Sequence, residues 1–159
     1  MDRIVDQILT LLTASVKTPR GIKQIYKGDI VMIPRASIPA IVIDAKGTDI
    51  KTQTTFQDVD EYSIDIVVIL DARDYFNASA TVMTGKEFLT KIMEERISGT
   101  SNELKSDTIL KTIRSGFDSS SDFTLRADPN INYIFNTNRE FPTIEAVLSV
   151  RAISKIYAR

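Results

Sequence analysis

The stretch Tyr62-Ser-Ile-Asp-Ile-Val-Val-Ile-Leu70 is the part of the sequence that decides the fold. Apolar side chains occupy every second position from Tyr62 to Leu70, and a period of two is typical of a β-strand with one buried face. The positions between them begin as Ser and Asp and end as Val and Ile. We therefore predict a strand that is covered on one face along its whole length and on both faces at its second end.

Further strands are predicted on both sides of this one. Before it, two short apolar runs and a Thr-rich segment alternate with turn residues, and Lys46-Gly-Thr48 is predicted to be a turn. After it, a long regular strand closes the chain, with Leu148 and Val150 on its apolar face. The predicted strands are 30–33, 41–43, 49–56, 62–70, 123–125, 131–135 and 143–155.

Amphipathic helices are predicted in two parts of the chain. Residues 2–16 carry apolar side chains at helical spacing along one face. Residues 84–98 begin with the capping pattern Thr84-Gly-Lys-Glu87 and carry an apolar stripe that we expect to cover the closing strand. A shorter helix is expected at 109–116, with Gly as its last residue. Together the elements predict an α+β fold with a mainly antiparallel sheet packed against helices.

Composition limits the possible functions. With 159 residues, of which 43% are hydrophobic, the chain is expected to form a single domain over residues 1–159. It contains no Cys and no His, which excludes disulfides, thiolate metal sites and Ser-His-Asp catalysis. The net charge of -1 shows no excess of basic residues for specific nucleic-acid binding. Neither a membrane span nor a secretory leader is expected. We therefore assign no catalytic residue, cofactor or metal.

Asp44 and Lys46 form the sharpest enzymatic pattern in the sequence. A spacing of two at the end of an apolar strand puts both side chains on one face, which resembles the D-x-K half of a metal-dependent nuclease site. There the carboxylate would hold Mg²⁺ and the ammonium would position a water, with Asp29 as the upstream acid. A solvated hairpin before Gly47 contains the same residues, and we favour that interpretation.

Two polar stretches and one strand are typical of an interaction module. Residues 98–107 and 115–122 are rich in Ser, Asp, Asn and Gly, and we expect flexible loops there that become ordered on contact with a partner. The strand at 49–56 consists largely of Thr and Gln, a composition that tolerates pairing at a sheet edge. Mobile loops and an ordinary edge strand would give the same pattern.

The order of these segments carries a family resemblance. A short N-terminal helix is followed by Ile25-Tyr-Lys-Gly-Asp29, Ile33-Pro34 and Ile38-Pro-Ala-Ile-Val-Ile43, then by the Thr-rich strand and by the central strand leading into Arg73-Asp-Tyr-Phe76. This layout, over roughly residues 4–155, resembles the tail terminator (tail completion) proteins of long-tailed bacteriophages and the wider group of head–tail joining proteins.

The resemblance implies a curved sheet and a structural, non-enzymatic role in the virion. The chain would form a homo-oligomeric ring, a hexamer in that family, which caps the tail tube and joins the tail to the head connector or completion protein. DNA would pass through the lumen, and the ring would assemble in the host cytoplasm and remain at the tail–neck junction. Two alternatives stay open: another phage assembly module, such as a head-completion, neck or baseplate adaptor protein, and the nuclease of Asp29, Asp44 and Lys46.

Overall fold

The computed structural model describes residues 2–28, 32–54, 57–75, 84–99 and 102–154, of which 51–54, 57, 58 and 75 are described by their backbone alone. Within these residues six strands form one sheet in the order β1-β2-β3-β6-β4, and β5 also pairs with β6. The strands are β1 Gln24–Lys27, β2 Ala40–Thr54, β3 Gln57–Asp71, β4 Phe123–Leu125, β5 Asn130–Asn136 and β6 Thr143–Ser154. β1 runs parallel to β2, and the other pairs are antiparallel.

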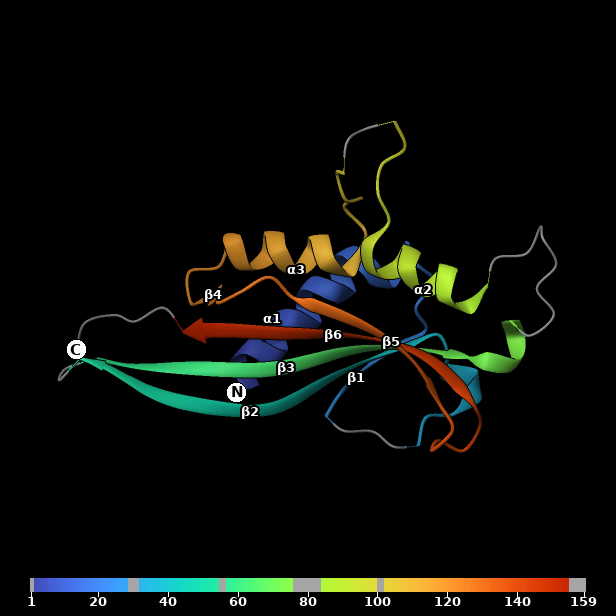
Figure 1. Cartoon of the computed structure of the whole chain (residues 1–159), viewed down its shortest axis with the longest axis horizontal. Helices are drawn as coiled ribbons and strands as arrows, with labels where there is room; N and C mark the ends of the chain where they lie inside the picture. Colours follow the sequence, from blue (N-terminus) through green and yellow to red (C-terminus); the bar gives the residue numbers. More distant parts are fainter. Residues whose placement is uncertain (1, 29–31, 55–56, 76–83, 100–101, 155–159) are drawn as a thin grey trace.

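Three described α-helices lie against one face of this sheet (Figure 1). They are α1 Asp2–Leu12, α2 Gly85–Glu94 and α3 Ile109–Asp118, and α1 continues as a π-helical turn over Thr13–Lys17. The predicted α+β class, with a mainly antiparallel sheet and helices packed on it, is confirmed. We call the sheet surface under the helices the helix face and the opposite surface the second face.

The two longest strands differ from the sequence prediction. β2 runs without interruption through Lys46-Gly-Thr48, so the predicted turn is wrong. The strand expected at 41–43 and residues 49–54 of the strand expected at 49–56 belong to this one strand, and residues 55 and 56 lie outside the described residues. The register passes from Ala45 opposite Ile64 to Gly47 opposite Ser63, so β2 carries one extra residue at this point. A β-bulge of this kind bends the strand without ending it. Figure 1 shows β2 and β3 curving together as one long hairpin.

The first strand also lies elsewhere than predicted. Residues 24–27 form β1, which the sequence analysis did not assign as a strand. Of the strand expected at 30–33, residues 30 and 31 lie outside the described residues, and Ile33 is outside any strand but buried. Pro34 follows it and cannot donate a backbone hydrogen bond to a sheet, which explains why Ile33 packs as part of a connection.

Both later helices begin at a threonine cap, and the one at Thr84 was predicted. The Thr84 hydroxyl accepts a hydrogen bond from the backbone N–H of Glu87, and Thr108 caps α3 in the same way. α2 ends at Glu94, earlier than the predicted residue 98. α3 continues past Gly116, so part of the loop predicted at 115–122 is helical. A side chain at Gly116 would collide with Leu11 of α1, and this glycine therefore allows two helices to approach closely instead of ending one.

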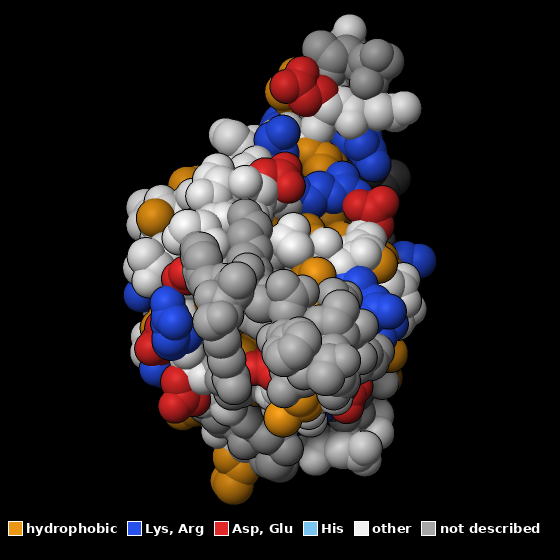
Figure 2. All heavy atoms as spheres, turned by 90° about the vertical axis from the view of Figure 1, so that its left-hand side faces the viewer, with side chains coloured by type: hydrophobic (Ala, Val, Ile, Leu, Met, Phe, Trp, Pro, Cys, Tyr) orange, Lys and Arg blue, Asp and Glu red, His pale blue; other side chains and the backbone are white. Residues whose placement is uncertain are grey.

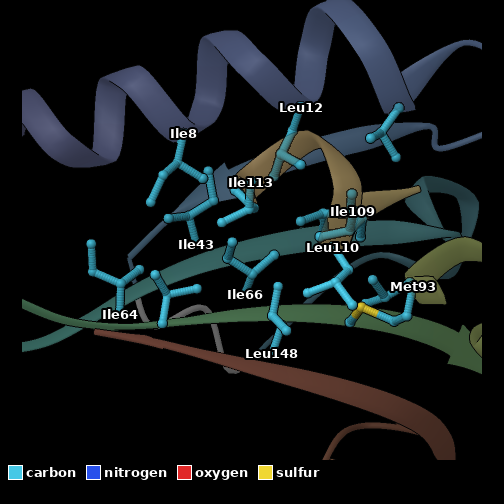
Figure 3. Packing of buried hydrophobic residues seen from close by; sticks show 14 of the residues in the cluster. Ile8, Leu12, Ile43, Ile64, Ile66, Met93, Ile109, Leu110, Ile113 and Leu148 are labelled. Atoms are coloured by element: carbon cyan, nitrogen blue, oxygen red, sulfur yellow. The ribbon is translucent and has the colours of Figure 1, made fainter. Parts of the chain in front are cut away.

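The main core fills the space between the helices and the helix face (Figure 3). Ile8 and Leu12 of α1 point toward Ile43 and Ile66 of the sheet, and Leu148 lies beside them on β6. Leu148 and Val150 are buried on this face, as predicted. The expectation that α2 covers β6 is correct only in part, because α1 and α3 contribute to the same cluster. Their buried side chains in it include Ile4, Ile8, Leu12, Ile109, Ile113 and Phe117.

A smaller apolar cluster lies on the second face. It is formed by Ile33, Ile38, Ala40, Val42 and Ile69, with partly buried Tyr26, Val67 and Phe141 packed against it. The connection through residues 32–39 thus covers the end of the sheet at which β3 is apolar on both faces. This confirms the predicted double coverage of that strand.

Candidate interaction surfaces

In the part of the chain that the structure describes, the residues of the candidate nuclease pattern are not brought together as a metal site. Asp29 lies outside the described residues. Asp44 and Lys46 form an ion pair at 2.5 Å between Nζ and Oδ2, and the strand continues past them. The register places Asp65 of β3 opposite Asp44, a neighbour that the sequence did not suggest. Among the described residues, no group of three or more His, Cys, Asp or Glu side chains could hold a metal ion.

Three carboxylates are buried along the second face, and arginines bind all of them. Glu61, Asp71 and Glu145 are each at most 2% exposed. Glu61 pairs with Arg126 and Arg151, which are remote from it in sequence. Burying a carboxylate without a partner would cost several kcal/mol, so these arginines are needed to hold the charges inside the protein.

Glu145 has a second kind of partner. Arg139 Nη2 lies 2.9 Å from Glu145 Oε1, and the Thr143 hydroxyl donates to Glu145 Oε2 at 2.8 Å. Thr143 is itself fully buried. The carboxylate therefore ties the start of β6 to the turn that precedes it.

Asp71 is the centre of the second arginine cluster. Arg35 Nε lies 2.6 Å from its Oδ2, Arg73 Nη2 lies 2.9 Å from the same oxygen, and the Arg73 backbone N–H donates to Oδ1. The hydrogen bond from the Arg73 side chain is the main cause that lowers the pKa of Asp71 below its ordinary 3.8, and burial opposes it. Arg73 also stacks over Phe141, with its guanidinium carbon 5.1 Å from the ring centre.

A groove of about 550 Å³ lies beside this cluster. Its walls are mainly apolar, and its polar groups are the two arginines already bound by Asp71 and the side chain of Glu140. The residues that line it are Met32, Ile33, Pro34, Arg35, Arg73, Glu140 and Phe141. Because the arginines are neutralised by carboxylates, the groove offers no excess of positive charge to an anionic ligand.

The connection between α2 and α3 projects from the body of the protein (Figures 1 and 2). We call the described residues of this connection, 95–99 and 102–107, the finger. Its two arms pair through a bridge between Arg96 and Leu104 and through backbone hydrogen bonds from Ile97 to Glu103 and from Lys105 to Glu95. The loop predicted at 98–107 therefore contains paired backbone. Its predicted mobility stays a prediction.

An ion-pair network fixes the base of the finger to the turn that follows the first helical segment. Arg20 donates to Glu95 and to Asp107 at 2.6 Å each, and Lys105 donates to Glu95 at 2.9 Å. The hydrogen bond from Lys105, followed by the one from Arg20, lowers the pKa of Glu95 below its ordinary 4.5. Arg20 is mostly buried, so this network is screened from water more than a surface pair would be.

In the part of the chain that the structure describes, the longest unpaired stretches of strand edge belong to β2 and β5, and the short end strands β1 and β4 also have an unpaired outer side. β1 pairs with β2 only as far as Ile43, and no described strand lies along residues 48–54, which we call the β2 edge. At the other side of the sheet β5 pairs with β6 alone, and we call its outer side, residues 130–136, the β5 edge. Ile50 is 71% exposed on the first edge, and Phe135 is 56% exposed on the second.

The β5 edge lacks the features that usually prevent strands from associating. Its sequence Asn-Ile-Asn-Tyr-Ile-Phe-Asn contains no charge and no proline, and its register with β6 has no bulge. Proteins normally protect such edges with lysines, prolines or bulges. The β5 edge is therefore suited to accept a further strand.

Comparison with protein-family models and with curated protein sequences finds no match for this chain. In the described residues no helix is long and apolar enough to cross a membrane.

Proposed function

We propose that this chain is a structural subunit of the tail of a long-tailed bacteriophage, a tail terminator whose copies form a ring. The ring would cap the tail tube and join the tail to the head connector. The observation that carries the proposal is that long unpaired strand edges, on β2 and on β5, lie on opposite sides of one sheet. The resemblance in the order of the sequence segments supports it independently.

Open edges on opposite sides favour a head-to-tail contact between copies. In such a contact one surface of a subunit meets a different surface of the next, and a closed ring forms when the rotation between subunits completes a circle. Six copies are the number that the family resemblance implies. A self-complementary dimer would use one edge twice and would leave the other edge exposed.

The charged groups of the second face support a structural role. The buried carboxylates of Glu61, Asp71 and Glu145 are engaged by arginines, and Asp44 is bound by Lys46. Side chains held in this way stabilise the sheet. They are less suited to bind a substrate or a metal, because each carboxylate would first have to release its cation.

The finger supplies a projecting contact outside the sheet. It carries charges of both signs, and the Arg20 network holds its base. In the proposed ring the finger is available to contact the tail tube or the head connector without disturbing the edges that join the subunits.

Electron microscopy of tail tubes mixed with the purified protein tests this function. We expect a ring at one end of each tube and an arrest of tube growth when the protein is added during polymerisation. A protein that binds head connectors but never tube ends would be an adaptor of another part of the neck. A protein that binds neither would contradict the proposal.

A further inference from the structure

We infer that the copies join by continuing the β-sheet, with the β5 edge of one subunit paired to the β2 edge of the next. Phe135 of one copy then lies opposite Ile50 of its neighbour. This inference rests on the proposed function, since it specifies the partner as a second copy of this chain and the contact as strand addition.

The direction of the strands permits this pairing. β2 is antiparallel to β3, β3 to β6, and β6 to β5. β5 is therefore antiparallel to β2 within one subunit. If the sheet continues from one copy into the next without reversal, β5 meets the neighbour's β2 in antiparallel orientation, which is the more stable ladder.

The two exposed apolar side chains lie on the same face of the sheet. Ile50 is opposite Asp60 of β3. Asp60 is two residues before Tyr62 in the strand and therefore lies on the same face, the helix face. Phe135 is opposite Ile144 of β6, which packs against the main core on that same face. A continued sheet therefore brings Phe135 and Ile50 together, and each removes the other from water.

The neighbouring positions are compatible with this register. With Phe135 opposite Ile50, the antiparallel order puts Asn136 beside Asp49 and Tyr133 beside Thr52, so no like charges oppose each other. The same contact uses the β2 edge and the β5 edge of every subunit. Pairing of two β2 edges or of two β5 edges would leave one kind of edge exposed.

Cysteine cross-linking tests the register directly, because the chain contains no Cys of its own. Opposite residues of an antiparallel pair have Cβ atoms about 4.5–5.5 Å apart, close to the separation that a disulfide spans. The variant with both Ile50→Cys and Phe135→Cys is oxidised after assembly and separated on a non-reducing gel. We expect a ladder of covalent multimers from it. We expect only dimers from a mixture of the two single variants.

The matched control is Ile50→Cys combined with Ile134→Cys. Ile134 is also exposed but belongs to the second face, so we expect no ladder from this pair. A covalent dimer from the single variant Ile50→Cys would replace the inference with a two-fold contact between β2 edges. Rings that form normally without a ladder would overturn the inference and leave the proposed function intact. No assembly of the parent protein, alone or on tail tubes, would overturn both.

Discussion

The arginines around Glu61 allow a sharp test of how the second face is held together. Glu61 is 1% exposed, while the side chains of Arg126 and Arg151 are 46% and 53% exposed. Replacing either arginine by Ala removes one partly solvated pair, and we expect a loss of about 0–1 kcal/mol in the free energy of unfolding. Replacing both removes the two arginines from a carboxylate that is buried in the folded protein, and we expect a loss above the sum of the single losses, up to about 3–5 kcal/mol. The two substitutions are therefore expected to be strongly non-additive.

Urea denaturation of the parent, the two single variants and the double variant measures this coupling. A total stability of roughly 5–15 kcal/mol leaves the double variant measurable or just unfolded. The control repeats the cycle with Glu61→Gln, an amide of similar shape without the charge, and there the coupling should largely disappear. Additive losses of equal size with Glu61 and with Gln would refute the reasoning, because the arginines would then act independently of the carboxylate.

Three further predictions follow from the buried and paired side chains. Leu148→Ala should lower the free energy of unfolding by about 2–5 kcal/mol because the side chain is fully buried. Ser149→Ala, on the second face, should change it by less than about 1 kcal/mol. Thermal melts of both variants check this, and equal melting temperatures would mean that the strand faces are assigned wrongly. Replacing Asp44 and Lys46 together by Ala should cost about 0–1 kcal/mol and leave ring assembly intact; a Mg²⁺-dependent cleavage activity of the parent that disappears in this variant would restore the nuclease hypothesis. Because the pKa of Glu95 is lowered in the folded protein, its contribution to stability is complete above its ordinary pKa of 4.5 and is lost as the pH falls toward the folded pKa. The difference in unfolding free energy between the parent and Glu95→Gln should therefore be constant near neutral pH and shrink below about pH 4.5. A difference that grows on acidification would contradict the direction of this pKa shift.

The parts of the fold that were predicted correctly are those with local signals. The alternation around Leu148 fixes which side of β6 is buried, and the helical spacing of residues 2–16 fixes the face of α1 that meets the sheet. Thr84 could be identified as a cap because its partner lies only three residues away. In each case the pattern and its structural cause lie within one element.

The features that were missed depend on contacts between distant segments. Gly47 has the composition of a turn, but pairing with β3 extends β2 through it as a bulge. Gly116 resembles a helix end, but α1 packs against it. Glu61 resembles a solvent-exposed acid, but it is buried, and its partners Arg126 and Arg151 are 65 and 90 residues away. No pattern within one segment encodes such a pair.

Native mass spectrometry of the purified protein at micromolar concentration, alone and after addition of tail tubes, tests the central claim most directly. The proposed ring predicts one closed assembly with six times the subunit mass of 17.8 kDa, formed either spontaneously or on the tubes. A two-fold dimer, an open-ended series of masses, or a monomer that remains single in the presence of tubes would contradict it.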